Sequence, residues 1–128
     1  MTKIFANIFG ALLLLLGILG FIPEVTPHGM LLKIFQANHS LNFVHLFSGM
    51  AGIWCGLSSS LAAKVYFRFF GFVYALFAVM GLFARHGIVL GRIANNVADT
   101  WLHVAIAIIF LILGLASSTQ EPATLPVI

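Results

Sequence analysis

Two similar stretches, NHSLNFVHLFSG at residues 38–49 and NVADTWLHVAIA at residues 96–107, organise this chain. Each begins with an Asn, places a His seven residues later and leads into an apolar segment of membrane length. At 1.5 Å per residue, each His lies about 10 Å inside the helix that its Asn begins. The two stretches therefore predict two helices, each with an imidazole buried at the same depth.

The composition predicts an integral membrane protein. Of the 128 residues, 62% are hydrophobic and 7% are charged, whereas about 25% of the residues in soluble domains are charged. Six Lys and Arg and three Asp and Glu cannot cover a soluble domain of this size, so we expect the lipid bilayer to surround most of the surface. The basic residues stand singly at the ends of apolar runs, which excludes nucleic acid as an expected partner. Cys55 is the only cysteine, so no intrachain disulfide can form.

Four apolar runs predict an all-α, integral membrane four-helix bundle in one domain, residues 1–116. The expected helices span about residues 4–22, 41–57, 66–84 and 99–116, followed by a polar tail, 117–128, that we expect to be disordered. The segment 29–37 is expected to form a helical turn in the membrane interface, and 85–95 to repeat it. Residues 62–68 are the expected connection between the second and third helices. Short loops imply an up-down-up-down order with both termini on one side.

The charge pattern does not fix the orientation in the membrane. Three basic residues are expected on each side, so the positive-inside rule gives a tie: Lys3, Lys64 and Arg68 against Lys33, Arg85 and Arg92. The charged middle connection favours termini in the cytoplasm. The expected location is the cell inner (cytoplasmic) membrane, as a multi-pass protein.

An internal repeat relates the two halves. A shift of 58 residues places Asn38 on Asn96, His45 on His103 and Gly56 on Gly114, and a shift of 61 places Gly10 on Gly71 and Gly20 on Gly81. The chain is therefore predicted to use one helical hairpin twice, as a parallel repeat about a pseudo-twofold axis along the membrane normal. In that arrangement His45 and His103 lie at equal depth.

The polar residues of the second and fourth helices share a face with their histidines. At 100° per residue these faces hold Asn38, Asn42, Ser48, Gly49, Gly52 and Gly56 in one helix, and Asn96, Asp99, Thr100, Ala107, Phe110 and Gly114 in the other. Polar and small residues in membrane helices point inward, so we expect these faces to meet, with Gly49, Gly52, Gly56 and Gly114 at helix contacts. Gly52 and Phe110 are equivalent positions, and the ring is expected to fill the space that the glycine leaves.

The two motifs resemble those of a known family. N-x-x-x-N-x-V-H-x-x-x-G at residues 38–49 and N-x-x-D-x-x-L-H at residues 96–103 are similar to motifs in a large family of small four-span bacterial membrane proteins, catalogued as a domain of unknown function. The resemblance covers roughly residues 5–115. It implies the fold and the membrane location, and it implies no activity.

The polar residues allow a structural interpretation first. Asn38 and Asn96 are expected to cap their helices, because Asn satisfies the first free N–H groups well. Asp99 stands one turn before His103 and is expected to hydrogen-bond it, and Asn42 is expected to bond His45. Such a cluster would clamp the two hairpins in register.

Three chemical alternatives use the same residues. His45 and His103 would serve as axial ligands of a haem b, or with Asp99 as ligands of a transition metal. Asp99 and His103 would relay protons or line a transport pathway, because ionisable groups inside membranes are often functional. A further metal cluster on the extracytoplasmic side would combine His28, His39 and His86.

The chain lacks a nucleophile–base pair, a phosphate-binding loop and paired carboxylates, so no catalytic residue is predicted. A large apolar surface with small loops is typical of a protein whose partners also lie in the membrane. The sequence therefore predicts a small non-enzymatic membrane protein without a cofactor, either a subunit of a larger membrane assembly or a self-associating bundle. A haem-binding or metal-binding redox protein is the first alternative, and a small transporter or proton conduit is the second.

Overall fold

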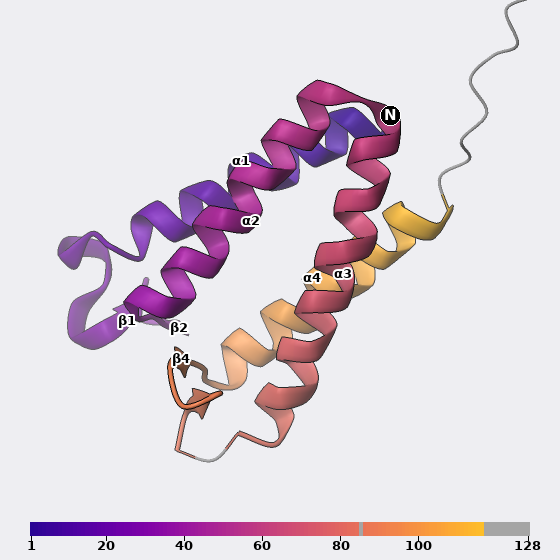
Figure 1. The fold of residues 1–128 in the computed structure, drawn as a ribbon. Coiled ribbons are helices and arrows are strands. Elements are labelled where there is room, and N and C mark those ends of the chain that lie inside the picture. The colour runs from indigo at the N-terminus through magenta and orange to yellow at the C-terminus, as the bar shows by residue number, and fades with distance from the viewer. Residues whose placement is uncertain (85, 117–128) are drawn as a thin grey trace, which may run out of the picture.

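Four α-helices make up most of the structure: α1 (Thr2–Leu19), α2 (His39–Ser58), α3 (Ser60–Leu82) and α4 (Val97–Ala116). The computed structural model describes residues 1–84 and 86–116, and the expected polar tail, 117–128, lies outside them. Two 3-10 turns, η1 (Pro23–Val25) and η2 (Pro27–Gly29), follow α1. Figure 1 shows α1 alongside α2 and α3 packed with α4, the two pairs being joined by the tight turn between α2 and α3.

Three of the helices, α1, α3 and α4, are long and apolar enough to cross a membrane. The sequence predicts four such helices, and α2 is outside this set. The reason is its composition, because Asn42, His45 and Ser48 and several glycines interrupt its apolar residues.

Each helix carries a stripe of large exposed apolar side chains, three, four or seven residues apart. The stripes include Ile8, Leu12 and Leu15 on α1; Phe43, Phe47, Met50, Trp54 and Leu57 on α2; Val65, Phe69, Phe72 and Leu76 on α3; and Trp101, Ile108, Ile112 and Leu115 on α4. Soluble monomers rarely expose apolar patches of this extent. The outer surface is therefore suited to lipid or to apolar partners.

Glycines let the backbones of α1 and α2 come into contact. A Cβ added at Gly10 would lie 2.7 Å from Ile53 N, and one at Gly49 would lie 2.8 Å from Gly10 O. In the other pair, a Cβ at Gly114 of α4 would lie 2.8 Å from Arg68 N of α3. No side chain larger than hydrogen fits at these crossings without moving a helix.

Tyr66 of α3 fills the space beside Gly52. A Cβ added at Gly52 would lie 2.7 Å from the Tyr66 hydroxyl, and the ring centroids of Tyr66 and Phe110 are 5.5 Å apart. The sequence predicts that the Phe110 ring fills the space that Gly52 leaves. Tyr66, from a third helix, contacts both of these residues. Phe110, Phe67 and Tyr74 are fully buried at the centre of the core.

The segments after α1 and α3 form β-hairpins, and the expected interfacial helical turn at 29–37 is wrong. Strand β1 (Met30–Leu31) pairs with β2 (Phe35–Gln36), and β3 (Ile88–Val89) pairs with β4 (Ile93–Ala94), both antiparallel. The residues at each tip have positive φ, 53° and 61° at Leu32 and Lys33 and 53° and 70° at Leu90 and Gly91. Two successive positive φ values characterise a type I′ hairpin turn and cannot occur in a helix.

The two hairpins have matching backbones, 58 residues apart. Met30 lies opposite Gln36, and Ile88 lies opposite Ala94. Gly29 O accepts a hydrogen bond from Ala37 N at 2.8 Å, and Gly87 O accepts one from Asn95 N at 2.9 Å. The conformation is therefore shared even where the side chains differ.

The connection between α2 and α3 is the single residue Ser59, and the expected connection at 62–68 is wrong. Ser59 is extended, and its side chain accepts a hydrogen bond from Ala62 N at 3.0 Å, which caps α3. The basic residues that suggested a loop lie inside the helix: Lys64 is buried, and Arg68 Nε donates to Gly114 O at 2.8 Å. The carbonyls at the end of α4 accommodate the Arg68 cation because helix C-termini attract positive charge.

We predict that Gly49→Leu destabilises the protein by at least about 1–3 kcal/mol, the usual cost of overpacking, because α1 would have to move away from α2. Met50→Leu, at the exposed neighbouring position, serves as the matched control and should leave stability unchanged. Unfolding in mild detergent, followed by circular dichroism, measures both. Equal stability of the two variants would contradict the tight crossing.

Candidate functional site

Asn38 and Asn96 each hold two parts of the structure together. Asn38 Oδ1 accepts a hydrogen bond from Leu41 N at 2.9 Å, and Asn96 Oδ1 accepts one from Asp99 N at 2.9 Å, so each asparagine caps its own helix. The Nδ2 groups reach in the opposite direction. Asn38 Nδ2 donates to Arg92 O at 2.7 Å, and Asn96 Nδ2 donates to Ile34 O at 2.9 Å. Each cap therefore also binds the tip of the hairpin from the other half.

Asp99 lies at the start of α4 and is almost completely buried. Its Oδ2 accepts hydrogen bonds from Asn96 N at 2.8 Å and from Gln36 N at 3.1 Å. The first completes a capping box with Asn96, and the second ties β2 to α4. Asp99 thus joins the two halves through backbone amides.

The expected hydrogen bond from Asp99 to His103 is not formed, since both ring nitrogens of His103 are buried without a partner. The free N–H groups at the start of a helix compete for a carboxylate better than an imidazole one turn later, because the helix dipole adds to their attraction. The expected bond between Asn42 and His45 is also not formed. Asn42 Nδ2 and His45 Nε2 both lack a partner.

His45 and His103 do meet at the centre of the helices, with ring centroids 6.0 Å apart. The Tyr74 ring lies against both, 6.4 Å from His45 and 5.6 Å from His103. Phe77 packs against His103 at 5.7 Å. The two imidazoles therefore lie in a mostly aromatic environment.

A second polar contact joins α2 to α3. The Ser48 and Tyr74 hydroxyls are 2.7 Å apart, and the Tyr66 hydroxyl donates to Ser48 O at 2.9 Å. Sequence reasoning placed Ser48 on the inward face but missed the tyrosines. One signal was present: the chain has two tyrosines, both in one apolar run, and a buried Tyr hydroxyl usually needs a partner.

The space and the side chains around His45 and His103 bear on the metal and haem alternatives. Among the residues that the structure describes, no three His, Cys, Asp or Glu side chains are grouped to hold a metal ion, so Asp99 does not join the two histidines as a ligand. A small cavity of about 10 Å³ touches His45, Asn42 and Asp99. Such a space holds about one water molecule, and a porphyrin would require the helices to separate.

The fold and this centre define a class: a mostly helical protein with four α-helices, three of them apolar enough to span a membrane, and with polar groups enclosed between the helix pairs. The chain belongs to the family described as Domain of unknown function (DUF4383), whose model matches residues 3–116. The resemblance to a family of unknown function is thereby confirmed. No curated protein and no solved structure matches the chain.

We predict that Asn38→Asp and Asn38→Ala separate the two roles of this side chain. Asp keeps the cap but loses the donor to Arg92 O, so the cost should be near the 0.5–1.5 kcal/mol of one hydrogen bond. Ala loses both, and should cost about 1 kcal/mol more because the cap is also removed. The free energy of unfolding in detergent measures the difference. If Asp costs nothing, the bond to the opposite hairpin does not contribute to stability.

Proposed function

We propose that this chain is a non-enzymatic, four-span protein of the cytoplasmic membrane that acts by binding other proteins within the bilayer. The observation that carries the proposal is the exposed apolar stripe present on every helix, α2 included. Four polar side chains hydrogen-bond residues of the opposite half, which supports a structural use for them: Asn38, Ser48, Asn96 and Asp99.

The stripe on α2 supports a fourth span. Phe43, Phe47 and Trp54 are among its exposed residues, whereas Asn42 and His45 point inward and are buried. Lipid contacts only the outward face of a helix, so inward polar groups lower the average apolarity without reaching the bilayer. In this proposal α2 crosses the membrane as α1, α3 and α4 do.

An up-down-up-down bundle built from a parallel repeat is part of the proposal. It is supported by the matched hairpins and by the exchange of bonds from Asn38 and Asn96, which is reciprocal under the 58-residue shift. Helix contacts also correspond: Gly20 faces Asn42, and Gly81 faces Thr100. Both ends of the described chain then lie on one side, which we propose is the cytoplasm.

The groove between α1 and α4 is the surface that we propose for a partner helix. It has a volume of about 400 Å³, and every residue that lines it is apolar, including Leu12, Leu16, Ile106 and Ile109. A transmembrane helix of another protein can pack there through van der Waals contacts, which drive helix association in lipid. A further copy of this chain would be the self-associating case.

We predict that single cysteines at the two ends of α2 react from opposite sides of the membrane. Ser40→Cys and Ser58→Cys, each made in a Cys55→Ser background, are labelled with a membrane-impermeant maleimide in intact cells and in inverted vesicles. With cytoplasmic termini, Ser40→Cys reacts in intact cells and Ser58→Cys in inverted vesicles. Labelling of both from one side would rule out the fourth span, and the reverse pattern would invert the orientation.

We predict that the protein extracted in mild detergent retains a stoichiometric partner in native mass spectrometry. Ile109→Trp in the groove should release the partner, whereas Phe72→Trp on the exposed face of α3 should retain it as the matched control. Retention in both variants would place the interface elsewhere, and a wild-type chain without any protein partner would count against the binding role.

One observation favours a second candidate, a metal-binding redox protein. A metal ion midway between two imidazoles, bonded to each at about 2 Å, would hold the ring centroids roughly 6 Å apart, close to the 6.0 Å between His45 and His103. Three of their nitrogens have no partner, and imidazole suits the redox-active metals Cu and Fe. The same mass spectra test this candidate, because a bound ion would be present in the wild type and absent in His103→Ala.

A further inference from the structure

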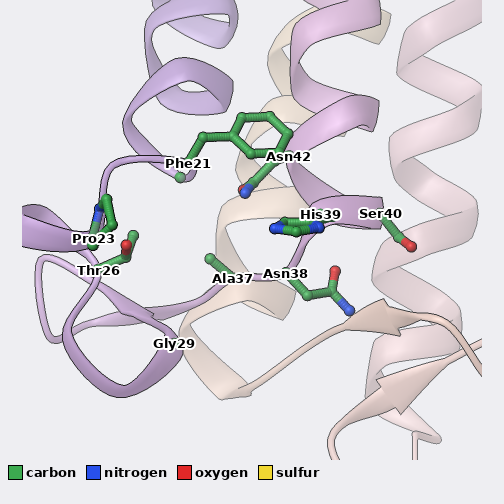
Figure 2. A pocket seen from close by; sticks show the side chains of 10 residues that line it. Phe21, Pro23, Thr26, Gly29, Ala37, Asn38, His39, Ser40 and Asn42 are labelled. Atoms are coloured by element: carbon green, nitrogen blue, oxygen red, sulfur yellow. The ribbon is translucent and has the colours of Figure 1, made fainter.

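A pocket of about 530 Å³ opens between the end of α1 and the start of α2. Its walls include Gly20 and Phe21 after α1, Ala37 after β2, and His39 and Asn42 of α2. Figure 2 shows these side chains around the open space. None of the ten residues that line the pocket is Asp or Glu.

In the other half of the protein, the Asn95 side chain lies in the corresponding space. By the shifts of 58 and 61 residues, Gly20, Ala37 and Asn42 correspond to Gly81, Asn95 and Thr100. Asn95 is buried and hydrogen-bonds Thr100, with Asn95 Nδ2 3.1 Å from Thr100 Oγ1. A Cβ added at Gly81 would lie 2.6 Å from Thr100 Oγ1 and 3.0 Å from Asn95 Oδ1, whereas the three atoms nearest to one added at Gly20 all belong to Asn42.

In the first half this side chain is missing. Ala37 stands in the place of Asn95, and Asn42 is left without the partner that Thr100 has. Asn42 is 2% exposed, and its Nδ2 donates to no group. Figure 2 shows the Asn42 amide directed from α2 toward the space between Phe21 and Ala37. A buried amide without a partner destabilises the protein, and a ligand in the pocket that accepted its hydrogen bond would remove that cost.

The start of α2 adds further donors to this wall. The first N–H groups of a helix have no partner within it, and Asn38 satisfies only that of Leu41. His39 and Ser40, which supply the first N–H groups of α2, are among the residues that line the pocket. Backbone amides at a helix N-terminus bind anions well, because they act together with the helix dipole.

We propose that this pocket binds a phosphate group that occupies the place taken by the Asn95 side chain in the other half. The oxygens accept from the amides of His39 and Ser40 and from Asn42 Nδ2. Phe21, whose ring lies 5.4 Å from that of His39, supplies an apolar wall for the carbon part of a ligand. A lipid headgroup and a free phosphate offer the same chemistry, and the site goes beyond the partner binding proposed above.

Two titrations distinguish these sources. The full chain, ¹⁵N-labelled in a maltoside detergent that contains no phosphate, is titrated first with inorganic phosphate and then, separately, with short-chain phosphatidylglycerol. The backbone amides of His39 and Ser40 and the side-chain amide of Asn42 are followed by NMR. Saturable shifts with phosphate identify a free anion, and saturable shifts with the lipid alone identify a headgroup. An absence of shifts in both titrations overturns the proposal.

Ala37→Asn should close the pocket, since it copies the arrangement of Asn95, and should weaken binding at least tenfold. Asn95→Ala is the matched control in the other half and should bind as the wild type does. Asn42→Leu removes the buried donor and gives a second test, with the same tenfold loss expected, should Ala37→Asn fail to fold. Wild-type affinity in any folded variant of Ala37 or Asn42 overturns the proposal.

Discussion

The rest of the structure depends on the hydrogen bonds at the starts of α2 and α4. The first backbone N–H groups of a helix have no partner within the helix and must find one elsewhere. Asn38 and Asn96 each cap their own helix with an oxygen and hold the opposite hairpin with a nitrogen. Because each asparagine depends on a carbonyl from the other half, neither half is complete alone at this end. Asp99 strengthens the same junction by accepting from β2 and from the start of α4. Buried backbone groups must be paired, and here the pairing also sets the register of the two halves.

Departures from the repeat mark the places where the two halves differ in what they can do. Leu41 stands where the second half has Asp99, so only one half contributes a carboxylate to the junction. Ala37 and Asn42 stand where the second half has Asn95 and Thr100, and both line a pocket in the first half. A duplicated hairpin can thus keep its backbone conformation while its polar side chains differ between the copies. In the second half they bond each other, and in the first half they line the pocket that we propose for a ligand.

The central histidines show why polar groups in a membrane helix are difficult to interpret from sequence. Their common face and depth could be predicted, and the structure brings the two rings to within 6.0 Å between centroids. Their partners could not be predicted, because a helical wheel shows which residues share a face and not which group competes best for a bond. The Asp99 carboxylate accepts hydrogen bonds from the backbone amides of Asn96 and Gln36. The two imidazoles therefore lie among aromatic rings without a carboxylate partner.

The sequence by itself determined the mostly helical fold, the family and the inward faces of α2 and α4, because apolar periodicity and helix length depend on local spacing. It also indicated Asn38 and Asn96 as the helix starts. It misjudged the hairpins at residues 30–36 and 88–94 and the α2–α3 turn at Ser59. Arg68 bonds a carbonyl 46 residues away, and the hairpin tips are held by asparagines more than 50 residues distant. Only the tertiary structure decides such features, since the groups that satisfy these polar atoms come from the other half of the chain.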